Sequence, residues 1–192
     1  SEMCIRDRKI TTVVFDMGQV LIHWTPFKIV EHMGLTEADK ALLMTELFQS
    51  VEWVQTDHGT IELSRVVEQV NARLPQHLHG AVEEIVMGWW RRPLLPMEGM
   101  GELVKELKEQ GYKIYLLSNA SVDLRKYFHR IPGSEYFDGL MVSAEENRIK
   151  PQHEIFNALY SRFHLNPEQC IFIDDSPANI EAALCTGMDG II

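Results

Sequence analysis

The polar side chains best suited to chemistry in this sequence follow short runs of β-branched and apolar residues. Such runs are typical of buried parallel strands, and in an open α/β sheet ligands bind at the carboxyl ends of the strands. We therefore expect these side chains to meet at one edge of a sheet, where a lysine that precedes a predicted helix joins them. The set comprises Asp16, Ser118, Asn119, Lys150, Asp174 and Asp175.

This combination of carboxylates, a hydroxyl and an ammonium suits the transfer of a phosphoryl group. A phosphate ester is doubly negative, so a carboxylate can approach it only where a cation offsets the repulsion. Mg²⁺ fits that role because it prefers oxygen ligands. One carboxylate can then attack phosphorus and form an acyl phosphate, while the hydroxyl and the ammonium hold the phosphoryl oxygens.

The elements that must position these groups alternate along most of the chain. Strands are predicted at residues 10–15, 113–117, 140–142, 170–173 and 190–192. Helices are predicted at residues 99–110, 122–130, 153–163 and 177–186. This alternation indicates βαβ units and a parallel, doubly wound sheet, with right-handed crossovers that place helices on both faces.

Residues 23–96 show a different pattern, with helices expected near 36–50, 60–74 and 78–90 and no convincing strand. We interpret this stretch as an α-helical insertion between two parts of one core domain, residues 9–22 and 97–192. Residues 1–8 lack the apolar core of a secretory signal, and we interpret them as a tag or a non-native leader.

Composition narrows the classes of function. Lys and Arg number 18 and Asp and Glu number 28, which gives a net charge of −10 without any basic run. Such a chain is a poor binder of nucleic acid or of anionic membranes. No apolar run approaches the roughly 18 residues that span a bilayer. The three cysteines have no zinc-binding spacing, which favours the reducing cytoplasm.

Four short segments, in order along residues 10–192, resemble the motifs of the haloacid dehalogenase-like hydrolases. They are Phe-Asp-Met-Gly-Gln-Val at 15–20, Leu-Ser-Asn at 117–119, Lys-Pro at 150–151 and Ile-Asp-Asp-Ser-Pro-Ala-Asn-Ile-Glu-Ala-Ala at 173–183. The resemblance implies a Rossmann-like α/β core with a doubly wound parallel sheet and an inserted α-helical cap domain. It also implies a Mg²⁺-dependent phosphatase that works through an aspartyl phosphate.

The resemblance assigns a role to each residue of the set. Asp16 is the expected nucleophile, and Lys150 pairs with the nucleophile and the phosphate. Ser118 is expected to bind phosphate, and Asn119 is included with it as a candidate. The expected ligands of Mg²⁺ are Asp16, the main-chain carbonyl of Gly18, and one or both of the carboxylates Asp174 and Asp175.

Position 18 departs from the pattern of most phosphatases in the family. They carry there a second Asp, which acts as general acid and then as general base, and such help is typically worth about 10²–10⁴-fold in rate. A form with Gly occurs in a bacterial subgroup that includes α-D-glucose-1-phosphate phosphatase, so we expect a sugar phosphate as substrate. The proton could come from a cap residue such as His58 or from water, or the leaving group could need little help.

Two other functions stay open at this point. A 2-haloacid dehalogenase would share the fold, but its chemistry needs no metal, and the pair Asp174 and Asp175 argues against it. A non-catalytic regulatory or binding protein would explain Gly18. We expect the partner to be a small phosphorylated metabolite and the protein to be a monomer or a homodimer.

Overall fold

A parallel sheet of five strands, β1 (Thr12–Phe15), β2 (Lys113–Ser118), β3 (Gly139–Val142), β4 (Cys170–Ile173) and β5 (Asp189–Ile191), forms the centre of the fold. Its order is β3-β2-β1-β4-β5. The structure, a computed structural model, describes residues 9–192. The leader predicted at residues 1–8 lies outside the described residues.

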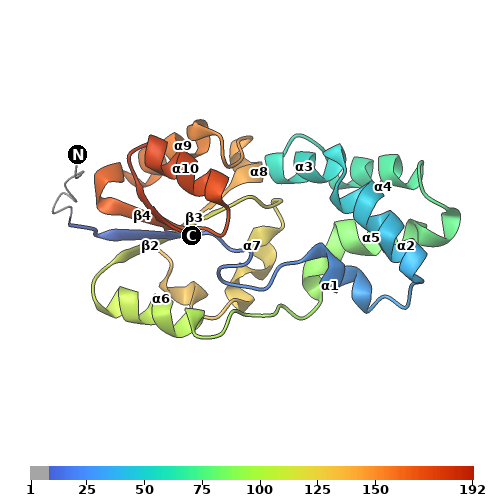
Figure 1. The fold of residues 1–192 in the computed structure, drawn as a ribbon, viewed down its shortest axis with the longest axis horizontal. Helices are drawn as coiled ribbons and strands as arrows, with labels where there is room; N and C mark the ends of the chain where they lie inside the picture. The colour runs from blue at the N-terminus through green and yellow to red at the C-terminus, as the bar shows by residue number, and fades with distance from the viewer. Residues whose placement is uncertain (1–8) are drawn as a thin grey trace.

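Helices cover both faces of this sheet. Figure 1 shows α9 (His153–Phe163) and α10 (Pro177–Cys185) on one side and α6 (Met100–Glu109) on the other. The side chains of β1 alternate accordingly, because successive residues of a strand point to opposite faces. Val13 and Phe15 belong to one hydrophobic cluster and Val14 to the other. The predicted doubly wound, Rossmann-like sheet is therefore confirmed.

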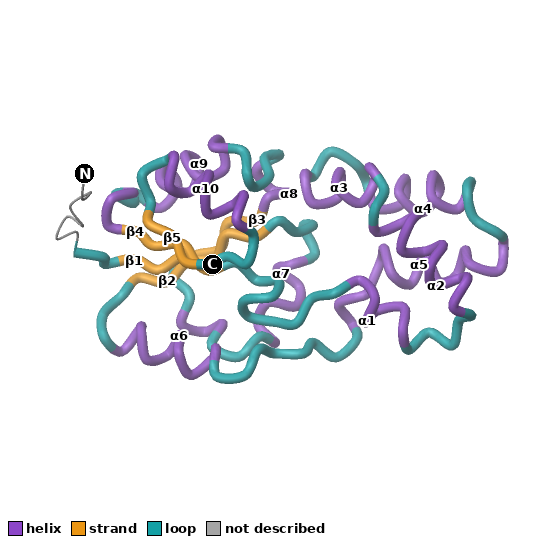
Figure 2. Tube along the Cα trace, viewed as in Figure 1, coloured by secondary structure: helices purple, strands orange, loops and turns teal. Residues whose placement is uncertain are grey.

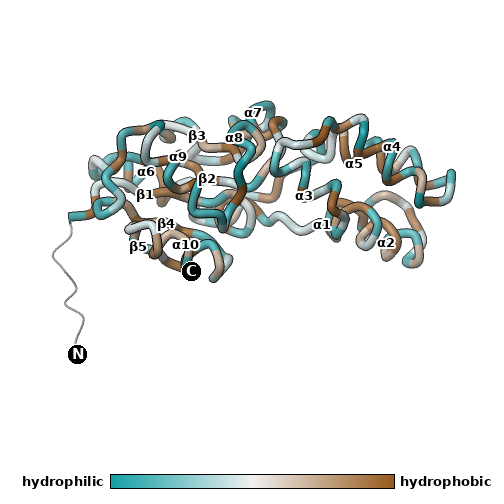
Figure 3. Tube along the Cα trace, turned by 90° about the horizontal axis from the view of Figure 1, so that it is seen from above, coloured by the Kyte–Doolittle hydropathy of each residue, from teal (hydrophilic) through white to brown (hydrophobic). Residues whose placement is uncertain are grey.

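A group of helices lies beyond the carboxyl ends of the strands, separate from the sheet in both views (Figures 2 and 3). It contains α1 (Pro26–Glu31), α2 (Glu37–Leu43), α3 (Val51–His58), α4 (Leu63–Asn71) and α5 (His79–Gly88). These helices bury a hydrophobic cluster of their own, which includes Val30, Leu47, Val70 and Ile85. No helix within residues 9–192 is long and apolar enough to cross a bilayer.

The two chain segments that join this group to the sheet run side by side. The backbone N–H of His23 donates to the carbonyl of Leu95 at 2.7 Å, and that of Met97 donates to the carbonyl of Leu21 at 2.9 Å. Pairing of the outgoing and returning segments fixes where the helical group leaves the sheet and where it rejoins it.

Sequence periodicity missed α1 and α3 and misplaced two helix boundaries. In α3, Val51 and Val54 are exposed, so the helix has no apolar stripe to reveal it, although Ser50 caps it by accepting from the N–H of Trp53 at 3.2 Å. The helix expected at 36–50 ends earlier, in a single π-helical turn at Met44–Phe48, and the helix expected at 60–74 begins at Leu63.

Arg73 ties these helices together, and its removal should destabilise them. Its guanidinium binds both oxygens of Glu52 at 2.7 and 3.0 Å and reaches Glu46 at 3.2 Å. Because Arg73→Met leaves the buried Glu52 without its partner, we expect the free energy of unfolding to fall by about 1–3 kcal/mol in urea titrations. The exposed pair of Arg65 with Glu68 provides the control. Arg65→Met should lower the free energy of unfolding by less than about 0.5 kcal/mol.

The stabilisation that the contact of Arg73 with Glu52 provides should depend on pH. Arg73 holds the pKa of Glu52 below its ordinary value of 4.5. A depressed pKa stabilises the fold above the unfolded-state pKa, and this stabilisation is lost as pH falls. The difference between wild type and Arg73→Met should therefore shrink below about pH 4; a difference that stays constant down to pH 3 would contradict this account.

Candidate active site

The carboxyl ends of β1 and β4 place two of the predicted carboxylates next to each other. These strands are neighbours with Phe15 opposite Ile173, so the residues that follow, Asp16 and Asp174, leave the sheet at the same edge. The backbone N–H of Asp16 donates to the carbonyl of Ile173 at 2.9 Å, which extends the sheet contact up to the carboxylate.

The ammonium of Lys150 lies between these two carboxylates. Its Nζ is 2.9 Å from Asp16 Oδ1 and 2.6 Å from Asp174 Oδ2, and all three residues are buried. Burial raises the pKa of Asp16, the charge of Asp174 raises it further, and Lys150 lowers it. Because buried charges are tolerated only when they are paired, Lys150 is what allows two carboxylates at this depth.

Further hydrogen bonds fix Asp174. Its oxygens accept from the backbone N–H of Ser176 at 2.8 Å and from the side-chain amide of Asn179, 3.0 Å from each oxygen. Asp175 is exposed, yet one oxygen from each of Asp16, Asp174 and Asp175 lies within 4.8 Å of the others.

The donor set at this edge fits Mg²⁺. Three carboxylates face one ammonium, so the cluster keeps a net negative charge, and its ligand atoms are all oxygens, as Mg²⁺ prefers. No group within residues 9–192 donates a hydrogen bond to the carbonyl of Gly18, so this oxygen is also available as a ligand. Its role stays a prediction.

Ser118 ends β2 and Asn119 follows it, as predicted, and their environments differ. The Asn119 amide exchanges two hydrogen bonds with the backbone of Lys150, accepting from its N–H at 2.8 Å and donating to its carbonyl at 3.0 Å. Asn119 thus holds the Lys150 segment in place. Ser118 is buried at the last position of β2. Phosphate binding by either residue stays a prediction.

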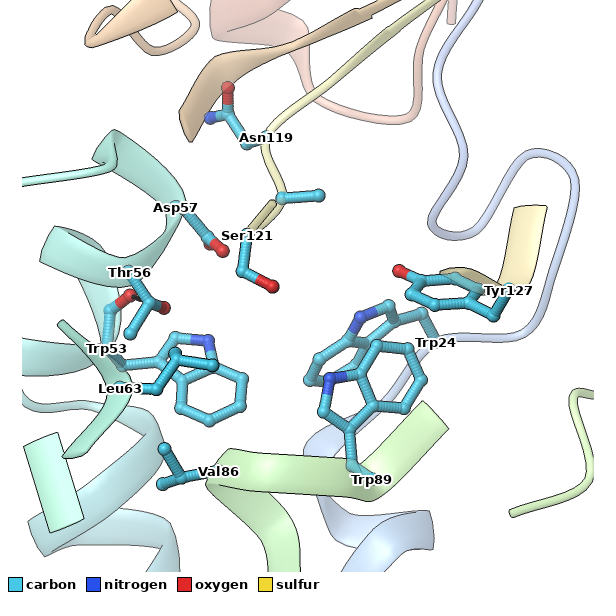
Figure 4. A pocket seen from close by; sticks show the side chains of 11 residues that line it. Trp24, Trp53, Thr56, Asp57, Leu63, Val86, Trp89, Asn119, Ser121 and Tyr127 are labelled. Atoms are coloured by element: carbon cyan, nitrogen blue, oxygen red, sulfur yellow. Dashed lines mark hydrogen bonds between the residues drawn. The ribbon is translucent and has the colours of Figure 1, made fainter. Parts of the chain in front are cut away.

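A pocket of about 150 Å³ opens beside this cluster, between the sheet and the helical group (Figure 4). The Asn119–Ser121 loop forms its core side. The indoles of Trp24, Trp53 and Trp89, together with Tyr127 and Asp57, form much of the rest. The pocket therefore combines an apolar, aromatic wall with a polar edge near the carboxylates.

Trp24 lies next to Gly18 of the first motif. A Cβ built on Gly18 would lie 3.4 Å from Cβ of Trp24, an ordinary van der Waals contact, so a side chain at position 18 would pack next to this tryptophan. The Trp24 backbone N–H donates to Gln19 Oε1 at 2.9 Å, which keeps the segment close to the first motif.

Asp57 is the pocket residue that sequence reasoning missed. His58 is the cap residue that the sequence suggests as a proton source, but its Nε2 lies 2.8 Å from the carbonyl of Asn147. Asp57, one position earlier in α3, lines the pocket instead. Only a correct prediction of α3 would have shown that Asp57 and His58, adjacent in sequence, have different surroundings.

Comparisons with known proteins agree with this geometry. The model of a family described as haloacid dehalogenase-like hydrolase matches residues 10–187. A sesquiterpene phosphatase of Aspergillus oryzae is 30% identical over 93% of this chain and 87% of its own. A D-ribitol-5-phosphate phosphatase of Bacteroides thetaiotaomicron is 26% identical over 89% and 85%.

A solved structure shows the same fold. It is that of a family enzyme from Bacteroides thetaiotaomicron in complex with magnesium and inorganic phosphate; it has a TM-score of 0.72 and 21% identity over 95% of this chain and 93% of that one. The chain belongs to the haloacid dehalogenase-like hydrolases, as the motifs predicted. The phosphatases among its relatives support the predicted class of enzyme, a hydrolase of phosphoric monoesters.

Loss of the Asn119 amide should loosen the Lys150 segment. Lys150 is buried, so Asn119→Ala leaves its backbone N–H without an acceptor, and we expect the free energy of unfolding to fall by about 1–2 kcal/mol. Asn157→Ala, on the exposed face of α9, should change it by less than about 0.5 kcal/mol. Equal unfolding midpoints in urea for the two variants would show that the Asn119 contacts do not stabilise the fold.

Proposed function

We propose that this protein is a Mg²⁺-dependent phosphatase that hydrolyses a small phosphorylated metabolite through an aspartyl phosphate on Asp16. The observation that carries the proposal is the position of the Asp16 carboxylate. It lies at a strand end, 2.9 Å from the ammonium of Lys150, in an all-oxygen cluster next to a pocket. A carboxylate in this setting suits attack on a dianionic phosphate better than any role in packing.

The chain's own residues divide the work. Asp16 attacks phosphorus in line, and Lys150 and Ser118 hold the phosphoryl oxygens while charge moves onto the bridging oxygen. Asn119 acts by positioning Lys150. Mg²⁺, held by Asp16, the Gly18 carbonyl and one or both of Asp174 and Asp175, would neutralise phosphate charge when bound.

The helical group supplies the other half of the site. We propose that residues 23–96 form a cap domain on a discontinuous core, residues 9–22 and 97–192. The separate hydrophobic cluster and the paired connecting segments support this division. Such a cap would exclude bulk water and select the substrate.

A sugar phosphate is the first substrate to test. Relatives include the D-ribitol-5-phosphate phosphatase and a phosphorylated carbohydrates phosphatase of Thermotoga maritima, and indoles can pack on the C–H face of a sugar. A second candidate is the phosphate of an apolar alcohol, since one relative is a sesquiterpene phosphatase and three tryptophans line the pocket. We keep the cytoplasm as the proposed location and a monomer or homodimer as the proposed state.

A screen of phosphate monoesters tests the proposal. Wild-type protein with Mg²⁺ should release inorganic phosphate from at least one sugar or apolar-alcohol phosphate, and EDTA should abolish the release. Asp16→Asn, which keeps the size of the side chain and removes the nucleophile, should lower the rate by about 10³-fold or more.

Two results would overturn the proposal. Halide release from a 2-haloacid without Mg²⁺ would identify a dehalogenase. Phosphate release no faster than with Asp16→Asn on every ester, together with saturable binding of one of them, would identify a binding protein.

The tryptophan wall should contact the alcohol part of the substrate. Trp53→Leu should raise KM for the best ester by roughly tenfold through lost aromatic contact, but should leave inhibition by inorganic phosphate unchanged. Trp90 is the matched control, because its indole donates to Asp123 Oδ2 at 3.0 Å outside the pocket. Equal effects of Trp53→Leu and Trp90→Leu on KM would contradict this placement.

A further inference from the structure

Hydrolysis of an alkyl phosphate needs a proton at the leaving oxygen, and the first motif offers none at Gly18. In-line displacement puts the leaving oxygen on the side of phosphorus opposite the nucleophile. The pocket, which Asp57 at the end of α3 and Asn119 after β2 line, lies next to the strand ends that carry Asp16. A donor must therefore come from the pocket wall or from solvent.

Several hydrogen bonds hold the end of α3 against the core. Ser143 Oγ donates to the backbone carbonyl of Asp57 and accepts from the N–H of Ala120 at 2.9 Å. One hydroxyl thus joins α3 to the pocket loop that follows β2. His58 Nε2 is 2.8 Å from the carbonyl of Asn147, so the next residue of the helix is held as well.

The residue that ends α3 permits an unusually close approach to the core. Gly59 has φ 73°, which favours glycine, and its carbonyl accepts from the side chain of Asn147 at 3.0 Å. A Cβ on Gly59 would lie 2.0 Å from the carbonyl oxygen of Ala144. Only glycine fits this contact, so the direction of the preceding side chains is set by the docking.

The carboxyl of Asp57 is thereby directed into the pocket. Figure 4 shows it between Thr56 and Ser121, with its oxygens pointing toward Ser121. No group within residues 9–192 hydrogen-bonds this carboxyl, whereas Asp174 is bound by Lys150 and by two further donors. A carboxyl held in a pocket without a protein partner is free to contact a substrate.

We propose that Asp57 is the general acid and general base of this enzyme, supplied by the cap in place of a side chain at position 18. The inference rests on the proposed phosphatase activity and deepens it. Asp57 is then a catalytic residue that touches the leaving oxygen of the substrate.

The two chemical steps balance with this assignment. In the first, a carboxylate oxygen of Asp16 bonds to phosphorus, the bond from phosphorus to the ester oxygen breaks, and the carboxyl proton of Asp57 passes to that oxygen. The alcohol leaves and Asp57 becomes a carboxylate. In the second, water enters the vacated side and gives one proton to Asp57 while its oxygen bonds to phosphorus. The aspartyl phosphate bond breaks, and inorganic phosphate leaves.

The surroundings of Asp57 favour its protonated form before the first step. Burial, and then the charge of Asp16, raise its pKa to about 7. Tyr127 faces it from α7 (Leu124–Tyr127) and remains a neutral phenol, because burial and the charges of Asp57 and Asp123 raise its pKa. Lys150 is engaged by Asp16 and Asp174. At neutral pH an appreciable fraction of Asp57 can therefore donate a proton.

The test compares two leaving groups in the full-length protein with Mg²⁺. The values of kcat/KM for an alkyl phosphate and for 4-nitrophenyl phosphate report the first step. Asp57→Asn should lower the alkyl value by about 10²–10⁴-fold, the usual worth of general acid catalysis. The aryl value should fall by less than about tenfold, because 4-nitrophenolate leaves without a proton. Retained aryl activity also shows that the variant is folded.

A pH profile provides the second readout. In wild type, kcat/KM for the alkyl ester should fall as pH rises through about 7, since only protonated Asp57 can donate; this limb should be absent in Asp57→Asn. Asp39→Asn removes a carboxyl that binds His77 on the far part of the cap, and should leave both esters and the profile unchanged.

The outcomes separate the two proposals. Equal losses on both esters, or no loss on either, would overturn the role of Asp57 while the phosphatase assignment stands. An absence of activity above Asp16→Asn on every ester would overturn the phosphatase itself.

Discussion

The ammonium of Lys150, held between Asp16 and Asp174, is the interaction on which the rest of the site depends. In a chain with a net charge of −10, two buried carboxylates at adjacent strand ends would repel each other and would lose most of their hydration. One cation at 2.9 and 2.6 Å makes their burial possible. Asn119 holds the segment that carries this cation, because its side-chain amide accepts from the backbone N–H of Lys150 and donates to the backbone carbonyl of Lys150.

Much of the core could be predicted from sequence because its signals are local. The apolar runs that became β1 and β2 are buried on both faces, and that of β4 is buried on one face and half-buried on the other. Such runs need no tertiary information to be recognised. Four motifs in order then placed Asp16, Lys150 and the acidic pair at one sheet edge. The mutual contacts of these residues follow from a parallel sheet in which β1 and β4 are neighbours.

The pocket could not be predicted in the same way, because tertiary docking determines it. α3 has no apolar stripe, so its residues gave no periodic signal, and the choice between His58 and Asp57 depends on which of them faces α8 (Ser143–Glu146). The close contact of Gly59 with the backbone of Ala144 determines which of these two side chains faces α8. Tertiary contacts also make Trp24 a neighbour of Gly18, since a Cβ at position 18 would be in van der Waals contact with this tryptophan.

In the proposed mechanism Asp16 carries the phosphoryl group, and trapping the intermediate tests this role most directly. If Asp57 activates the water of the second step, its removal should slow that step and let the phosphoenzyme accumulate. Asp57→Asn protein, mixed with 4-nitrophenyl phosphate and Mg²⁺ and quenched in acid, should show by peptide mass spectrometry a phosphoryl group on Asp16. Turnover of the ester with no phosphoryl group on Asp16 at any quench time, or with the group on another residue, would contradict the account.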